Sequence, residues 1–148
     1  MEFGRIRADE HPQVLHLLAE CGLPTAGVDQ ALLRYFVGAR SQGALASVIG
    51  LEPLDHLALL RSLAVTPAHR GLGVGSRLCD EAESLARGRG IAHLYLLTTT
   101  AADWFGARGY ARLDRADLPD AVRQSEQFRT LCPATAVAMH KLLAGRAA

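Results

Sequence analysis

The sequence lacks the cysteine and histidine patterns that mark disulfide-rich or metal-binding proteins. Its three cysteines, Cys21, Cys79 and Cys132, are odd in number and far apart. Such a set fits neither a disulfide framework nor a CxxC metal site, so we expect reduced thiols. Of the six histidines only His11 and His16 lie close together, and at this spacing they occupy different faces of a helix. The sequence therefore predicts no metal.

An excess of charge of one sign, long hydrophobic runs and a leader segment are also missing. Sixteen Lys and Arg residues against fifteen Asp and Glu residues leave a net charge of +1. This balance offers no basic surface for nucleic acid or an anionic membrane, and no acidic tail. No run approaches the ~20 apolar residues of a membrane-spanning helix, and residues 1–5 do not resemble a signal peptide. We expect a cytoplasmic protein whose partner is a small molecule, with no nucleic acid and no membrane.

What is present is an ordinary globular composition. Hydrophobic residues make up 49% and charged residues 21% of 148 residues, and 14 glycines and 6 prolines stay below low-complexity levels. A chain of this length can bury a real core, and no linker or internal repeat interrupts it. The sequence predicts a single domain over residues 1–148.

Hydrophobic periodicity predicts an α/β (α+β) order of elements. The expected strands cover residues 2–7, 36–40, 44–51, 57–65, 91–99, a stretch from 110 and residues 135–143, and the expected helices cover 9–21, a stretch from 29, 73–88, 101–108 and a stretch from 117. Asp9, Asp29 and Asp117 are the expected caps of three of these helices. Pro53 and Asp55 mark a turn before the strand at 57–65, which is apolar enough to be central.

The most informative segment, residues 65–76, joins the central strand to a helix through a glycine-rich turn. Unpaired first-turn amides and the helix dipole favour an anion by ~0.3–1 kcal/mol per group. Gly73 and Gly75 let phosphate oxygens approach the backbone, and Arg70 can add a charged fork. The spacing from Gly71 ends on a serine instead of a third glycine, and the P-loop lysine is absent, so dinucleotide and P-loop motifs are both disfavoured.

The pattern Arg70-x-x-Gly73-x-Gly75 after a strand resembles the pyrophosphate loop of the GNAT superfamily of acetyl-CoA-dependent N-acetyltransferases. Residues 94–99 and 104–110 are also similar to that superfamily, so the resemblance covers nearly the whole chain. It implies a mixed, mostly antiparallel central sheet with splayed fourth and fifth strands, flanked by helices. It also implies acetyl-CoA as cosubstrate, bound by Leu63, Ala64, Val65, Arg70, Gly71, Leu72, Gly73, Val74, Gly75, Ser76, Trp104 and Phe105.

A narrower similarity rests on three further segments. Residues 60–65, 95–100 and 126–133 resemble acetyltransferases associated with arsenic resistance, and they are also similar to the acetyltransferase domain of N-acetylglutamate synthase. This resemblance implies a bacterial origin, an amino-acid-like acceptor and a role in arsenic resistance or detoxification.

The GNAT resemblance also implies a mechanism. The pantetheine arm pairs with the backbone of residues 63–65, where the Val65 amide donates to the thioester oxygen as it becomes an oxyanion. Many relatives carry a carboxylate on the fourth strand, but Leu59 and its neighbours offer none. Glu52 is therefore the candidate base, with a solvated turn carboxylate as the alternative. Where many relatives have a tyrosine that protonates the departing thiolate, this chain has Phe105.

Candidate acceptor-binding residues lie on the fourth and fifth strands. Arg61 and Ser62 point to opposite faces if strand pairing is regular, so only one can reach the acceptor without a bulge. The fork of Arg61 suits a substrate carboxylate, and a salt bridge within the protein is the alternative. Thr98 and Thr99 offer hydroxyls to substrate or cofactor, although threonines also simply favour strands.

These observations leave three readings of function. The leading one is an acetyl-CoA-dependent N-acetyltransferase acting on the amine of a small amino-acid-like molecule. The alternative is a sensor that binds acetyl-CoA without transferring acetyl, since Leu59 and Phe105 leave both usual proton-handling positions empty. In a third reading the three cysteines bind trivalent arsenic directly, which their separation in the sequence disfavours. An open sheet edge would allow a homodimer.

Overall fold

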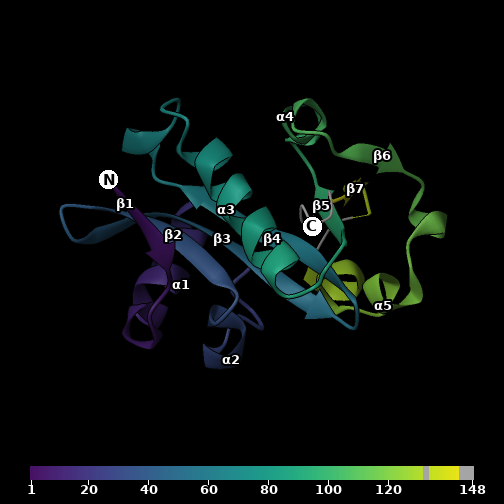
Figure 1. Ribbon diagram of the computed structural model, residues 1–148, viewed down its shortest axis with the longest axis horizontal. Helices are drawn as coiled ribbons and strands as arrows, with labels where there is room; N and C mark the ends of the chain where they lie inside the picture. Colours follow the sequence, from purple (N-terminus) through teal and green to yellow (C-terminus); the bar gives the residue numbers. More distant parts are fainter. Residues whose placement is uncertain (132–133, 144–148) are drawn as a thin grey trace. The chain divides into compact units, whose positions relative to one another are not determined.

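The computed structural model describes residues 1–131 and 134–143 and contains a seven-stranded sheet (Figure 1). The strands follow the order β1-β2-β3-β4-β5-β7-β6. The strands are β1 (Glu2–Arg5), β2 (Phe36–Ser41), β3 (Ala44–Leu54), β4 (Leu57–Val65), β5 (His93–Thr98), β6 (Ala111–Leu113) and β7 (Val137–Leu142). The pairs β1–β2, β2–β3, β5–β7 and β6–β7 are antiparallel, and β4–β5 is parallel. The predicted mixed, mostly antiparallel sheet is confirmed.

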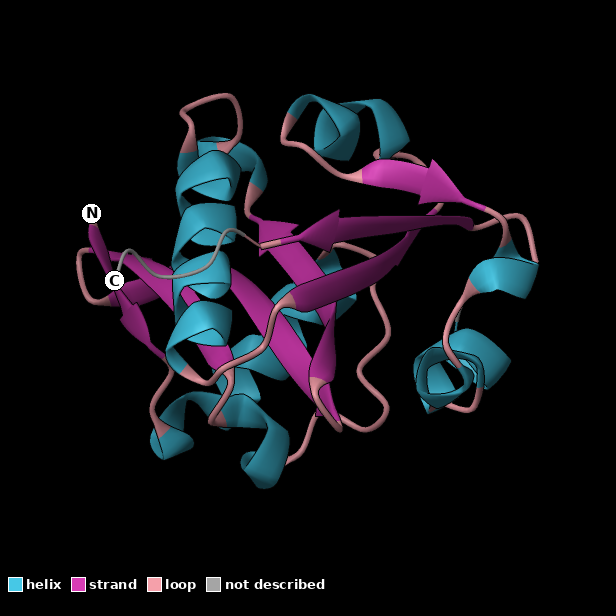
Figure 2. Ribbon diagram, turned by 45° about the vertical axis from the view of Figure 1, so that its right-hand side comes forward, coloured by secondary structure: helices cyan, strands magenta, loops and turns pink. Residues whose placement is uncertain are grey.

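Five α-helices accompany the described strands (Figure 2). They are α1 (His11–Glu20), α2 (Gln30–Leu33), α3 (Val74–Gly88), α4 (Ala102–Ala107) and α5 (Asp120–Arg123). The cap at Asp29 is confirmed, because its Oδ1 accepts a hydrogen bond from the Leu32 amide at 2.9 Å. No helix in the described part of the chain is both long and apolar enough to cross a membrane.

Three expected boundaries are wrong. Asp9 does not cap α1: it lies in a 3-10 turn, and the Glu10 carboxylate accepts from the Arg7 amide at 2.8 Å instead. Asp117 ends another 3-10 turn, and α5 begins only after Pro119, whose fixed φ suits a helix start. Pro53 lies inside β3 and not in a turn. In each case a contact or backbone preference that the hydrophobic pattern does not record decides the boundary.

The turn between β3 and β4 is consequently shorter than expected. Only Asp55 and His56 connect the strands, and Asp55 has a positive φ of 57°. Aspartate visits this left-handed region more readily than most residues because its short polar side chain bonds locally. The extension of β3 to Leu54 places Glu52 in a strand, which makes the solvated-turn interpretation of this carboxylate wrong.

The chain divides into two compact units, so the single domain stays a prediction. The first unit comprises residues 1–52 and 61–85, and the second comprises residues 53–60 with the described residues from 86 onward. The core of the first unit brings together apolar residues of α1, α2 and the strands β2, β3 and β4. Its buried members are Ile6, Val14, Leu17, Leu18, Val28, Leu33, Phe36, Val48 and Ala64.

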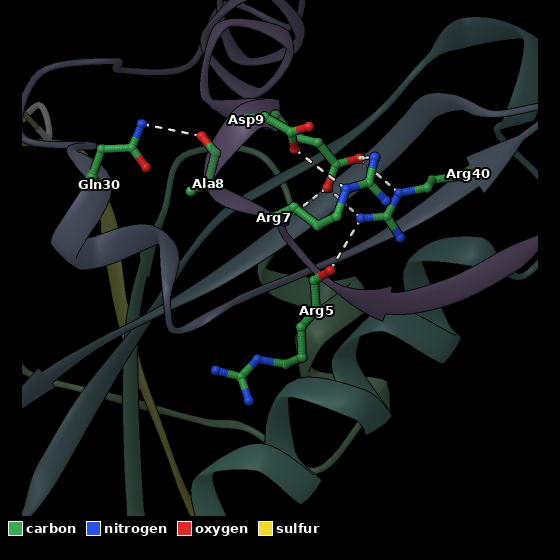
Figure 3. Close-up of polar contacts among 7 residues, drawn as sticks. Arg5, Arg7, Ala8, Asp9, Gln30 and Arg40 are labelled. Carbon is green, nitrogen blue, oxygen red and sulfur yellow. Dashed lines mark hydrogen bonds and ion pairs between the residues drawn. The ribbon is translucent and has the colours of Figure 1, made fainter.

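A buried ion pair joins β2 to the segment before α1 in the first unit (Figure 3). The Glu10 side chain is 1% exposed and the Arg40 side chain 11%. Arg40 donates from Nε to Glu10 Oε2 at 2.7 Å, and its Nη2 donates both to Glu10 Oε1 and to the Arg5 carbonyl. The Arg40 hydrogen bond holds the pKa of Glu10 below its ordinary value. This pair therefore links β1, β2 and the start of α1.

The second unit has its own core on one face of β4, β5 and β7. Leu57 and Leu59 pack there with Leu118, Val122 and Ala138. The parallel pairing of β4 with β5 covers only three residue pairs, from Leu57–His93 to Leu59–Tyr95, although both strands continue further. Such short pairing agrees with strands that diverge after their first residues.

Two histidines of the second unit also form a pair. His93 Nδ1 and His140 Nε2 lie 2.9 Å apart on neighbouring strands, and the Tyr95 ring lies 4.6 Å from the His140 ring. Burial, and next the charge of His93, lower the pKa of His140, and burial raises the pKa of Tyr95. A neutral His140 imidazole is thus favoured in this setting.

Candidate active site

The strand β4 carries a backbone irregularity at Ser62. This residue has a φ of 61°, in the left-handed region that residues other than glycine rarely adopt. Such a conformation costs about 1–3 kcal/mol and persists where the surrounding structure imposes it. The alternation of side chains is broken, because Arg61 Nε donates to the hydroxyl of its immediate neighbour Ser62 at 3.0 Å. The regular pairing on which the prediction of opposite faces depended is absent at this point.

Arg61 forms an ion pair with Glu52 of β3. Its Nη1 donates to Glu52 Oε1 at 2.6 Å. The Arg61 side chain is only 4% exposed, whereas the Glu52 side chain is 21% exposed. The salt bridge that the sequence left open is therefore present. Among the described residues, no acceptor is found for Nη2 of Arg61.

The segment after β4 places two glycines in the left-handed region. Gly71 has a φ of 78° and Gly73 a φ of 79°. A Cβ built on either residue would meet no atom within 4 Å. Backbone conformation, and not packing, therefore requires these glycines, and their backbone stays open to approach. Helix α3 begins directly afterwards at Val74, and the Arg77 amide closes its first turn on the Gly73 carbonyl at 3.1 Å.

The amides at this helix start are open. Across residues 1–131 and 134–143, no protein acceptor is found for the backbone amides of residues 71–75. Ser76 follows in the first turn of α3. A hollow of about 360 Å³ borders the same turn; it is lined by Met1, Phe3, Leu72, Gly73, Val74 and Arg77. A helix start of this kind can accept an anion, because its unpaired N–H groups and the helix dipole both favour negative charge.

Arg70 points back to the end of β4. Its Nε donates to the Val65 carbonyl at 3.0 Å, and its Nη2 lies 3.7 Å from Cys21 Sγ. The Cys21 thiol also lies 3.7 Å from the Val65 carbonyl. The sequence did not predict that Cys21 lies at this site, since nothing local signals a contact across 44 residues. Leu63, Ala64 and Val65 form the last part of β4, immediately before this contact.

The other candidate residues lie in the second unit. The Thr98 hydroxyl accepts from the Ala101 amide at 3.0 Å and so caps the turn into α4, and Thr99 is exposed after the end of β5. Phe105 is 8% exposed and packs edge-on against Tyr110, with ring centroids 5.6 Å apart. Trp104, a residue of α4, is 39% exposed. Phe105 and Tyr110 are thus core residues of this unit.

The strand, the open glycine turn and the helix start lie within one mixed sheet, and comparison with known families identifies the class of protein to which this fold belongs. Residues 5–114 match the acetyltransferase (GNAT) family. This match covers more than half of the chain, so the protein belongs to that family. The family predicted from the sequence resemblance is therefore confirmed.

The chain is also similar to curated proteins named amino-acid acetyltransferase. The chain is 34% identical over 91 residues to an amino-acid acetyltransferase of Pseudomonas putida strain KT2440, a match that covers 60% of this chain and 21% of the relative. It is 33% identical over 75 residues to an amino-acid acetyltransferase of Pasteurella multocida, covering 51% and 17%. The chain therefore spans about a fifth of the length of the curated relatives it matches.

Solved structures confirm the fold. N-acetylglutamate synthase from Neisseria gonorrhoeae, complexed with coenzyme A and N-acetyl-glutamate, superposes with a TM-score of 0.83 at 22% identity, over 97% of this chain and 35% of that one. Rv2747 from Mycobacterium tuberculosis, in a complex that contains CoA, gives a TM-score of 0.83 at 18% identity, over 97% and 100%. The predicted GNAT fold is thus shown by the sheet order and by these neighbours.

Proposed function

We propose that this protein is an acetyl-CoA-dependent N-acetyltransferase that acts on the amine of a small amino-acid-like molecule. One observation carries the proposal: the open amides of residues 71–75 follow β4 directly and lead into α3. Three comparisons support this proposal. The chain belongs to the GNAT family, its relatives include proteins named amino-acid acetyltransferase, and structures with the same fold contain CoA.

The cofactor diphosphate would lie against the amides of residues 71–75. Arg70 would add positive charge, either by turning from the Val65 carbonyl or through the N–H groups that do not face it. The pantetheine arm would run along residues 63–65 as an added strand. There the Val65 amide would donate to the thioester oxygen as negative charge develops on it, an interaction that commonly contributes several kcal/mol in a preorganised site.

The acceptor amine must be neutral to attack. An α-amine with a pKa near 8 costs only about 1–1.5 kcal/mol to deprotonate at pH 7, whereas a lysine-like amine costs about 4–5 kcal/mol. Weak base assistance therefore suits an α-amine, and Glu52 is the candidate base. Arg61 would hold the acceptor carboxylate, and Ser62, Thr98 and Thr99 would offer hydroxyls to substrate.

Direct attack in a ternary complex suits this chain better than an acyl-enzyme. Cys79 is fully buried, and Cys132 lies outside the described residues. Phe105 supplies no proton to the leaving group, but a thiol with a pKa near 8.5 can depart as its thiolate. Acetyl transfer therefore needs no general acid at this position.

The proposal extends to the biological setting that the narrower sequence resemblance implies. The protein would act in the cytoplasm of a bacterium, in arsenic resistance or detoxification, on an acceptor related to amino acids. A homodimer paired through a sheet edge belongs to the same proposal, and β1 and β6 are the edge strands.

An acceptor screen tests the function. The full chain is incubated with acetyl-CoA and a panel of amino acids, arsenic-bearing amino acids and simple amines, and thiol release is measured together with a mass increase of one acetyl group. We expect release with at least one α-amino acid well above the uncatalysed rate. Saturable acetyl-CoA binding without release across the panel would favour the sensor, and absence of binding would contradict both functions.

A further inference from the structure

We propose that Glu52 occupies a carboxylate-binding site on Arg61, and that the carboxylate of the incoming acceptor displaces it and frees it to act on the acceptor amine. This inference rests on the proposed function and deepens it, since it makes a carboxylate a requirement for a productive substrate. The site would take small α-amino acids and would reject the matching amines that lack a carboxylate.

The contact between the two side chains is incomplete. A guanidinium fork can bind a carboxylate through two parallel hydrogen bonds, but Arg61 uses only Nη1 towards Glu52, at 2.6 Å. Nε is taken by the Ser62 hydroxyl at 3.0 Å, and Nη2 has no acceptor among the described residues. Nη2 therefore remains available to a second carboxylate oxygen.

The two partners differ in their freedom to move. Arg61 is held inside by burial and by the Ser62 hydroxyl, whereas Glu52 keeps 21% of its side chain exposed and has one described polar contact, to Arg61. The left-handed Ser62, with a φ of 61°, stores strain at the residue that orients the guanidinium. These features allow Glu52 to swing towards solvent while Arg61 stays in place.

Because Arg61 is buried, Glu52 can leave it only when another carboxylate binds. A buried guanidinium without an anion is strongly unfavourable, so Glu52 leaves only when another carboxylate takes its position. The acceptor therefore releases the base by binding. An amine without a carboxylate cannot displace Glu52 and meets a carboxylate that is still paired with Arg61.

Acetyl transfer then removes two protons from the acceptor nitrogen. The freed Glu52 carboxylate takes one proton from the acceptor ammonium, and the amine lone pair attacks the thioester carbonyl carbon. The C–N bond forms, the C–S bond breaks, and the coenzyme leaves as a thiolate. The second nitrogen proton passes to that thiolate, while Glu52 gives its proton to solvent. The products are the N-acetyl amino acid, the free thiol of the coenzyme and one proton.

Two variants of the same ion pair give opposite predictions. Binding of the twenty standard L-amino acids, and of the amine that matches the tightest binder without its α-carboxylate, is measured by calorimetry on the full chain saturated with coenzyme A. E52Q removes the competing carboxylate and is expected to tighten amino-acid binding about tenfold. R61Q is expected to weaken it at least tenfold and to leave the matching amine unchanged. E81Q, which alters a surface pair on α3, is the control and should change nothing.

Steady-state kinetics of E52Q distinguish the proposed exchange from a salt bridge that only stabilises the fold. E52Q should lower KM for the amino acid while lowering kcat about a hundredfold, because the neutral amide competes less well for Arg61 and cannot act as a base. Weaker or unchanged amino-acid binding in E52Q would overturn the displacement, and an unchanged kcat would overturn the release of a base. Absence of amino-acid binding to both the wild-type protein and E52Q would overturn the inference as a whole.

An NMR titration of the wild-type protein tests the exchange without relying on the folding of a variant. The Arg61 Nε–H resonance should shift when the amino acid is added and stay unchanged when the matching amine is added. Shifts of equal size would contradict the inference. Coenzyme A binding is measured first and separately: a protein that does not bind it refutes the proposed function, whereas one that binds it but shows none of these shifts refutes only the exchange.

Discussion

Two of the arginine–glutamate pairs in the first unit, Arg40–Glu10 and Arg61–Glu52, are built differently. Arg40 grips both oxygens of Glu10, which is 1% exposed and also accepts from the Arg7 amide. Arg61 reaches a single oxygen of Glu52, which remains 21% exposed. The Glu10 carboxylate accepts from two nitrogens of Arg40 and from the Arg7 amide, whereas Glu52 accepts only from Arg61 Nη1 among the described residues. The Glu10 pair therefore suits a role in stabilising the fold. The Glu52 pair suits the proposed exchange, in which the acceptor carboxylate replaces Glu52 on Arg61.

The same contrast applies to backbone groups. Strand and helix interiors satisfy their own amides, but those of residues 71–75 find no acceptor in the described chain. Residues 71–73 are exposed, and the first amides of a helix have no partner within it, so these donors remain available to a ligand. Both candidate binding groups, Arg61 and the helix start, lie at or directly after β4.

The largest effect is expected at the Glu10–Arg40 pair. Glu10→Gln should lower the free energy of unfolding by about 3 kcal/mol, because it leaves Arg40 buried without its anion. Glu52→Gln should cost less, about 2 kcal/mol, because Glu52 makes one hydrogen bond to Arg61 and is 21% exposed. Urea denaturation of both variants measures the difference. Equal losses would break the distinction between the two pairs.

At low pH the Glu10–Arg40 pair should no longer contribute to the free energy of unfolding. The folded protein holds the pKa of Glu10 below its ordinary value, chiefly through the Arg40 hydrogen bond. A lowered folded-state pKa stabilises the protein above the unfolded-state value, and this stability is lost as pH falls through the folded-state value. The gap in unfolding free energy between wild type and Glu10→Gln should therefore be full at pH 7 and shrink below about pH 4.3. A gap independent of pH would contradict this origin.

A smaller effect is expected from Arg70→Ala. The substitution removes a charge near the open amides, and we expect coenzyme A to bind about tenfold more weakly, equivalent to about 1.4 kcal/mol. Amino-acid binding should change little. Calorimetry with each ligand separates the two, and Arg112→Ala, at a surface arginine of β6, shows whether general loss of positive charge explains the result. If both variants weaken coenzyme A equally, Arg70 has no specific role.

The smallest effect is expected at the strained serine. Ser62→Gly relieves the left-handed φ and should raise the free energy of unfolding by up to about 1 kcal/mol. Because the change also removes the hydroxyl that orients Arg61, amino-acid binding should weaken several-fold. Greater stability with unchanged binding would show that Ser62 does not position the guanidinium, and lower stability would show that its conformation is not strained.

Much of the fold could be predicted because its signals are local. The helix at α3 follows from its apolar spacing, and the glycine turn from the residues that permit a positive φ. The turn at Pro53 was mispredicted, because proline usually interrupts a strand and here it lies within β3. The predicted helix starts at Asp9 and Asp117 were also wrong. Near Asp9 the Glu10 carboxylate accepts from the Arg7 amide, and near Asp117 the helix begins only after Pro119.

The candidate site could be predicted only in part. The residues of the glycine turn, Arg61 and Glu52 were singled out from the sequence, but their pairing was one of two open alternatives. The left-handed Ser62 has no sequence signal, since serine is not a residue that favours a positive φ. The contact of Cys21 with the end of β4 and the Glu10–Arg40 pair join residues 44 and 30 positions apart, and only the folded chain brings them together.

The most direct test is a titration of the ¹⁵N-labelled full chain with coenzyme A, followed through its backbone amide resonances. The diphosphate should displace the water on the open helix start, so the account predicts the largest shifts at the amides of residues 71–75, and their loss in Gly73→Val. Binding that leaves these amides unshifted while others move would contradict it.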